Sequence, residues 1–186
     1  NVSEFHAGKL EAKMLIGDIK EALKSLTAKL STSNYKSVWE EEVQSLKEEW
    51  DEEYKRLAGY RYDEKFEPEV KAYREGSIEE FAKLADTELT QTSAIALIRD
   101  TIDKDAIITG ASGSLPGCLQ RMWTTDSLYS YHMEYGYSCM GYEVASALGC
   151  KLAEPKKEVY AMAGDGSFQM LHSEFATSIM EGEKIN

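Results

Sequence analysis

The stretch EVYAMAGDGSFQMLHSEF, Glu158 to Phe175, contains a short apolar run, the turn Gly-Asp-Gly-Ser and the start of a helix. Backbone N–H groups at a helix N-terminus lack intrahelical partners and attract anions, and glycine lets a phosphate approach the backbone closely. The Asp165 carboxylate would repel a phosphate unless a divalent cation lay between them. Mg²⁺ binds one or two carboxylates together with phosphate oxygens, so the turn is typical of half of a metal–diphosphate site. A tight turn in which Asp165 or Ser167 only caps the helix would have the same sequence.

Two further strand-and-helix segments precede this turn. DAIITGASGSLPGCLQ (105–120) predicts a strand at Ala106–Thr109 and then a loop of small residues, and YHMEYGYSCMGYEVASALGCKLA (131–153) predicts a loop and then a helix. ELTQTSAIALIRDTI (88–102) predicts a helix capped by Thr90 or Thr92. Strands that alternate with helices predict an α/β fold with a doubly wound parallel sheet, whose binding residues lie at the carboxyl ends of the strands.

The rest of the chain predicts two further parts. In residues 1–32, a buried strand at Met14–Gly17 would precede a helix capped by Asp18, as in the tail of a central α/β domain. We expect residues 33–88 to form an acidic helical linker and residues 89–186 to form the first portion of the last domain. Apolar residues recur in the linker at steps of three and four, which we interpret as core or interface packing of a connecting helix. These residues are Trp39, Val43, Leu46, Trp50, Tyr54 and Leu57.

Composition limits the kind of partner. The net charge of −12 argues against nucleic acid or an anionic membrane as the main partner. Three cysteines without a C-x-x-C pair predict reduced thiols in a cytoplasmic protein, and no apolar run reaches membrane-spanning length. The sequence lacks an initiator methionine and ends twenty residues after Gly166, so we expect a piece of a longer protein.

Three segments, in this order along the chain, resemble those of enzymes that depend on thiamine diphosphate (ThDP). GASGSLPGCLQRMW (110–123) is similar to the loop over the diphosphate, and YGYSCMGYEVASALG (135–149) to the segment that supports the aminopyrimidine ring. The Gly-Asp-Gly-Ser turn resembles the start of the diphosphate motif. In that family the motif runs on to an asparagine that also binds the metal, and Asn186 comes too early for that position.

Within this family, the three segments resemble most closely the hydrolases that open a cyclic trihydroxy dione in myo-inositol breakdown. The resemblance implies ThDP and Mg²⁺ as cofactors, 5-deoxyglucuronate as product, and a homo-oligomer whose active site is shared between subunits. It also places the glutamate that activates ThDP in a domain outside this chain, so we expect these 186 residues alone to be inactive. The alternatives are another ThDP-dependent lyase or synthase, such as a relative of acetolactate synthase, and a non-catalytic oligomerisation module.

The resemblance also implies roles for individual residues. Asp165 would bind Mg²⁺, and Met140 would lie beneath ThDP and hold it bent, although a methionine that merely fills the core is the alternative. The diphosphate and the pyrimidine edge would be bound by backbone or hydroxyl groups of other residues. These contacts fall on Gly113, Ser114, Leu115, Ser138, Met140, Gly164, Gly166 and Ser167.

Catalytic candidates come from the loop expected just before the pyrimidine segment. His132 and Glu134 could reach a polyhydroxylated substrate there, and a histidine can move protons near neutral pH. A structural, hydrogen-bonded histidine is the alternative for His132. His172, in the helix after the turn, is a weaker candidate, and Cys139 is expected to be a small buried residue.

Overall fold

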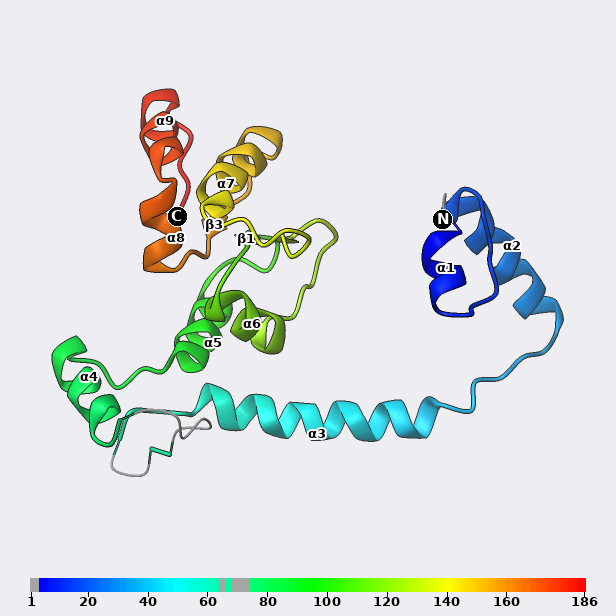
Figure 1. The fold of residues 1–186 in the computed structure, drawn as a ribbon, viewed down its shortest axis with the longest axis horizontal. Coiled ribbons are helices and arrows are strands. Elements are labelled where there is room, and N and C mark those ends of the chain that lie inside the picture. Colours follow the sequence, from blue (N-terminus) through cyan, green and yellow to red (C-terminus); the bar gives the residue numbers. More distant parts are fainter. Residues whose placement is uncertain (1–3, 64–65, 68–73) are drawn as a thin grey trace. The chain divides into compact units, whose positions relative to one another are not determined.

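The computed structural model describes residues 4–63, 66–67 and 74–186 (Figure 1). The chain divides into two compact units, Asn1–Glu48 and Glu49–Asn186, and the division falls inside helix α3 (Glu40–Ala58). The three-part domain organisation expected from the sequence stays a prediction.

The first unit contains helices α1 (Phe5–Lys9) and α2 (Ile19–Thr32). Asp18 caps α2 as expected, since its carboxylate accepts a hydrogen bond from the Glu21 backbone N–H at 3.2 Å. The strand expected at Met14–Gly17 is not formed, and these residues are exposed. A parallel strand needs neighbours to complete its hydrogen bonds, and the described part of this unit supplies none.

The second unit is built on a three-stranded parallel sheet. Its strands are β1 (Ile107–Gly110), β2 (Tyr131–Met133) and β3 (Val159–Ala161), in the order β2-β1-β3. Ile108 lies opposite Tyr131 on one side and Tyr160 on the other. The predicted parallel sheet is confirmed, and β1 coincides with the expected strand to within one residue. β2 replaces part of a segment expected to be a loop, so His132 lies on a strand.

Helices cover both faces of this sheet (Figure 1). α7 (Tyr142–Ala153) packs on β1 and β3, with α8 (Asp165–Met170) and α9 (Ser173–Glu181) beside it. α5 (Gln91–Thr101) and α6 (Ser114–Met122) pack together on the other side. The doubly wound arrangement predicted from the sequence is therefore confirmed. α4 (Ser77–Ala85) precedes α5.

Two apolar clusters form the core. One joins the end of α3 to α5 and α6 and contains Leu57, Ile95, Ala96, Leu119 and Met122. The other lies between α7 and the sheet and contains Ile107, Val144, Ala147, Val159 and Ile185. α5 begins with a capping box in which the Thr90 and Ser93 side chains each accept from the other's backbone N–H. Of the two caps expected from the sequence, Thr90 and Thr92, the structure shows Thr90.

The last residues of the chain lie along the edge of β3 that faces away from β1. The Asn186 N–H donates to the Val159 carbonyl at 2.9 Å, and the Ala161 N–H donates to the Asn186 carbonyl at 2.8 Å. The chain therefore leaves β1 toward β2 by way of α6, but leaves β3 toward the opposite edge by way of α8 and α9. In such a sheet the crevice between β1 and β3 is the topological switch point, where ligands bind.

Candidate cofactor site

The Gly-Asp-Gly-Ser turn lies at the carboxyl end of β3, at this switch point. Gly164 is the N-cap of α8, Asp165 is its first residue, and the Asp165 side chain is exposed. The first intrahelical bond is donated by the Phe168 N–H to the Gly164 carbonyl at 2.9 Å, so the N–H groups of the first turn are left for other acceptors. A Cβ at Gly164 would meet nothing within 4 Å, so this part of the turn is open to a ligand.

Met140 comes to the same place from the loop between β2 and α7. A Cβ built on Gly166 would lie 3.6 Å from the Met140 methyl group, so the methionine lies against the turn. The Met140 side chain is 42% exposed, which is more than core filling would leave. The structure therefore places Met140 next to the Gly-Asp-Gly-Ser turn. The family resemblance had assigned Met140 to the ring end of ThDP and the turn to its diphosphate end.

Glu134 holds the loop that carries Ser138 and Met140. Its two carboxylate oxygens accept hydrogen bonds from the Tyr137 and Cys139 backbone N–H groups, each at 2.8 Å. These two N–H donors hold the pKa of the Glu134 carboxyl below its usual value. Ser138 between them has a φ of 57°, a left-handed conformation that few side chains adopt without such support.

Glu143 was not singled out from the sequence, yet it is the most buried acid of the site. It lies in the first turn of α7 and is 0% exposed. The Ser167 hydroxyl lies 2.7 and 2.8 Å from its two carboxyl oxygens, and the Gly141 N–H donates to it at 2.9 Å. The Ser167 hydroxyl has one proton, which it donates to Glu143, so this hydroxyl has no proton left for a diphosphate.

The loop after β1 differs from the expectation. Gly113 is the N-cap of α6 with a φ of 100°, and Ser114 and Leu115 belong to the first turn of that helix. Gly113 and Ser114 are exposed, whereas Leu115 packs against the α5–α6 cluster. A helix N-terminus therefore stands at the end of β1, where a loop of small residues was expected.

Both candidate histidines make a hydrogen bond to a backbone carbonyl, whereas Cys139 is exposed to solvent. His132 lies on β2, where its Nε2–H donates to the Tyr129 carbonyl at 2.9 Å. His172 is an exposed residue between α8 and α9, and its Nδ1–H donates to the Phe168 carbonyl at 3.1 Å. Cys139 is exposed, so the expectation of a small buried residue was wrong. It lies in the loop held by Glu134, and both its backbone N–H and its thiol interact with that carboxylate.

The side chains of the site could bind a metal ion together with a diphosphate, but could not hold a metal ion by themselves. Within the described ranges no group of three or more histidine, cysteine or acidic side chains is placed to hold a metal ion. Mg²⁺ in nucleotide-type sites commonly uses one or two carboxylates and completes its shell with phosphate oxygens and water. Asp165 at an open helix N-terminus meets that requirement, so the residues present fit Mg²⁺ and a diphosphate.

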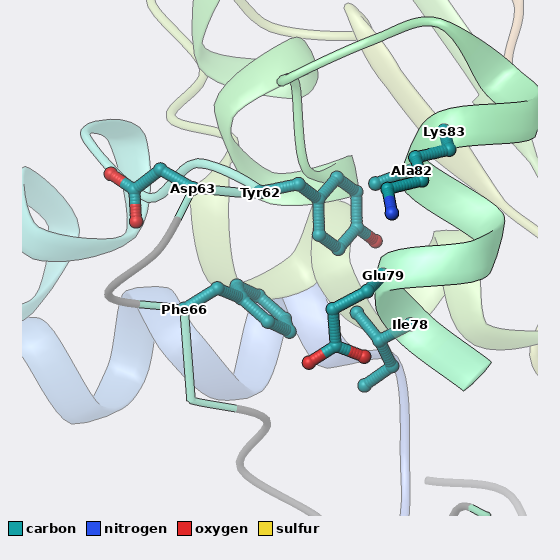
Figure 2. Close-up of a pocket in the computed structure, with 7 residues that line it drawn as sticks. All are labelled: Tyr62, Asp63, Phe66, Ile78, Glu79, Ala82 and Lys83. Atoms are coloured by element: carbon teal, nitrogen blue, oxygen red, sulfur yellow. The ribbon is translucent and has the colours of Figure 1, made fainter. Parts of the chain in front are cut away.

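A separate pocket of about 300 Å³ lies between Tyr62, Phe66 and α4 (Figure 2). The Tyr62 and Phe66 rings, whose centroids are 4.8 Å apart, face Ile78 and Glu79 of the helix. None of the residues assigned to the cofactor lines it. Among the described helices, none is both long and apolar enough to span a membrane.

The C-terminal part of the chain matches a known family. Residues 111–186 match the family described as thiamine pyrophosphate enzyme, C-terminal TPP binding domain, thiamine pyrophosphate being another name for ThDP. The matched residues include Met140, Glu143 and the Gly-Asp-Gly-Ser turn. The resemblance inferred from three short segments is confirmed.

Individual proteins are similar to this chain along its whole length. Proteins from Clostridium perfringens (strain 13 / Type A) and Clostridium botulinum (strain Eklund 17B / Type B) are each 58% identical over 186 residues. One from Bacillus thuringiensis (strain Al Hakam) is 54% identical over 187 residues. All three are named 3D-(3,5/4)-trihydroxycyclohexane-1,2-dione hydrolase. The alignments cover all of this chain, which spans 29% of the length of each relative.

Proposed function

We propose that the complete protein is a ThDP- and Mg²⁺-dependent hydrolase that opens the ring of 3D-trihydroxycyclohexane-1,2-dione to 5-deoxyglucuronate. The observation that carries the proposal is that the Met140 side chain lies against Gly166 at the open N-terminus of α8. Identity of 54–58% along the whole chain to enzymes named for this dione supports the choice of substrate.

The turn would hold the diphosphate end of the cofactor. Asp165 binds Mg²⁺ through its exposed carboxylate, and the backbone N–H groups of Gly166 and Ser167 donate to diphosphate oxygens. Contact through the Ser167 N–H fits a hydroxyl already committed to Glu143. The exposed backbone at Gly113 and Ser114, at the N-terminus of α6, approaches the diphosphate from the end of β1. Leu115 in the same turn packs its side chain on the core, so it would contribute through its backbone.

The loop between β2 and α7 would hold the other end of the cofactor. Met140 supports the bend between the two rings, and the backbone of Ser138 and Met140 binds the pyrimidine edge. Bound ThDP supplies the electron sink for cleavage of the carbon–carbon bond, and the protein orients it. The loop therefore has to be held in one conformation, which the bonds to Glu134 accomplish.

His132 and Glu134 are the proposed substrate-side groups. The lowered pKa of Glu134 keeps it ionised near neutral pH, so it acts as an acceptor rather than a proton donor. His132, whose Nε2–H donates to the Tyr129 carbonyl, would carry a proton to or from substrate through Nδ1. We place the complete enzyme in the cytoplasm as a homo-oligomer with a shared active site, and we expect these 186 residues alone to be inactive.

The test is calorimetric titration of ThDP into the complete protein, with and without Mg²⁺, beside Asp165→Ala. Binding should require both Mg²⁺ and Asp165. The matched control is Asp126→Ala, because Asp126 is an exposed acid just before β2, at the opposite edge of the sheet from the turn. Equal binding by wild type and Asp165→Ala would overturn the proposed metal site, and no binding by wild type would favour a non-catalytic module.

Substrate choice needs its own assay. The complete protein should release 5-deoxyglucuronate from the cyclic dione and should not condense pyruvate to acetolactate. The reverse outcome would place it among the acetolactate-synthase relatives.

A further inference from the structure

Glu143 is a buried carboxyl group that the proposed chemistry leaves without a role. It is fully buried in the first turn of α7, and no cationic side chain is among its hydrogen-bond partners in the described part of the chain. Burying such a group is costly unless its hydrogen bonds are satisfied, and an apolar residue of similar size would pack this position at lower cost. The groups that Glu143 binds should therefore explain why a carboxyl group stands at this buried position.

The partners of Glu143 come from both halves of the cofactor site. The Gly141 N–H belongs to the residue after Met140, and the Ser167 hydroxyl belongs to the residue after Gly166. These two partners also contact each other, since the Gly141 N–H lies 2.8 Å from Ser167 Oγ. The three groups form a closed triangle of hydrogen bonds between the methionine loop and the diphosphate turn.

The backbone of Glu143 adds a third anchor. Its carbonyl accepts a hydrogen bond from the Thr109 hydroxyl at 2.9 Å, and Thr109 is a fully buried residue of β1. The same residue is thus fixed to the strand at the switch point and to both loops that flank it. Hydrogen bonds in such a buried network reinforce one another, so the loops are held in one relative position.

We propose that Glu143 is a positioning residue that couples the pyrimidine end of the cofactor site to its diphosphate end. The inference rests on the proposed function. ThDP spans both loops, so its affinity depends on their relative position, whereas inorganic pyrophosphate occupies only the diphosphate end of the site and does not reach the methionine loop. Loss of the carboxyl group should therefore weaken ThDP more than it weakens pyrophosphate.

The experiment compares these two ligands in the complete protein by calorimetry in Mg²⁺. Glu143→Ala should weaken ThDP about tenfold or more, the effect of losing a buried hydrogen-bonded group, and should weaken pyrophosphate by much less. Glu143→Gln keeps the shape and one acceptor oxygen, and should recover most of the ThDP affinity. Ser167→Ala should resemble Glu143→Ala, and the double variant should lose little more than either single one.

Leu148→Ala is the matched control for destabilisation. Leu148 is a buried residue of the same helix that takes no part in the triangle. This variant should lower the melting temperature and leave both affinities at their wild-type values when binding is measured well below that temperature.

The outcomes separate the inference from the proposed function. A wild-type protein that binds no ThDP would overturn the proposed function itself. Wild-type binding of ThDP with equal affinity in Glu143→Ala, or an equal loss for ThDP and pyrophosphate, would overturn the coupling role alone. If Glu143→Ala does not fold, Ser167→Ala decides the matter by the same comparison.

Discussion

Glu134 has an acid–base behaviour that follows directly from its hydrogen bonds. Two backbone donors stabilise its charged form, so its folded-state pKa lies below the usual 4.5. A lowered pKa contributes stability that is fully present above pH 4.5 and is lost as the pH falls through the folded value. NMR titration of the Glu134 carboxyl carbon should therefore show a midpoint below 4.5.

The same bonds should be visible in the loop that they hold. Glu134→Gln keeps the shape but removes the charge, so the amide hydrogens of Tyr137 and Cys139 should exchange faster. Glu154→Gln, at the far end of α7, is the control and should change neither. Unchanged exchange in Glu134→Gln would show that the loop does not depend on this carboxylate.

Gly141 is a position where the backbone excludes any other residue. Its φ is 94°, and a Cβ there would lie 2.6 Å from the Leu171 Cβ. Gly141→Ala combines left-handed strain with a collision, so we expect a loss of about 2 kcal/mol or more in the free energy of unfolding. Gly149→Ala is the matched control, since Gly149 lies inside α7 with nothing within 4 Å of its Cβ position. There, alanine should stabilise by about 0.5–1 kcal/mol. Urea unfolding of both variants gives the comparison, and a neutral Gly141→Ala would contradict it.

At the scale of residues, some candidate site residues could be proposed from the sequence and others could not. The Gly-Asp-Gly-Ser turn was proposed as a metal–diphosphate site because it resembles the start of the ThDP diphosphate motif, although a turn that only caps the helix has the same sequence. Glu143 looks like an ordinary first-turn glutamate in MGYEVASALG, and its burial depends on Ser167, which is distant in sequence. The one available signal was an acid followed by a run of small and apolar residues in the helix predicted within 131–153.

At the scale of elements, local patterns predicted what local interactions determine. The Asp18 cap and the strand β1 were predicted, and Thr90 was one of two candidate caps, because these signals lie within a few neighbouring residues. β2 was missed because Tyr131–Met133 is short and mixed in polarity, and it is a strand only through its pairing with β1. The Met14–Gly17 strand was wrong for the converse reason, since it has an apolar sequence but no partner within its described unit.

The end of α3 supplies a test of packing at this scale. Leu57 is 2% exposed and packs with α5 and α6, whereas Leu46 on the same helix is 56% exposed. Leu57→Ala should lower the free energy of unfolding by about 2–5 kcal/mol, because it leaves a cavity in the core. Leu46→Ala should change it by less than about 0.5 kcal/mol. Chemical denaturation distinguishes the two, and similar losses for both would show that the whole apolar stripe of α3 is packed.

At the scale of the whole molecule, burial is concentrated in the second unit. None of the described side chains of residues 4–48 is buried, and the large apolar residues of α2 are exposed, namely Ile19, Leu23, Leu26 and Leu30. The second unit contains both core clusters. Since tertiary burial supplies most of the stability of a helix in a protein, the two units should differ strongly in protection.

Hydrogen exchange of the 186-residue polypeptide tests this difference. The amides of α2 should exchange at rates near those of an isolated 14-residue helix, which is marginal in water, while those of β1 and α7 should exchange only on global unfolding. Leu26→Ala should leave β1 and α7 unchanged, and Leu57→Ala should accelerate both. Slow exchange in α2 equal to that in β1 would contradict the expectation, since it would require a core that Ile19, Leu23 and Leu30 do not have. In the complete protein, protection of α2 should rise if other segments cover this apolar face, so the difference between the two measurements would locate the contact.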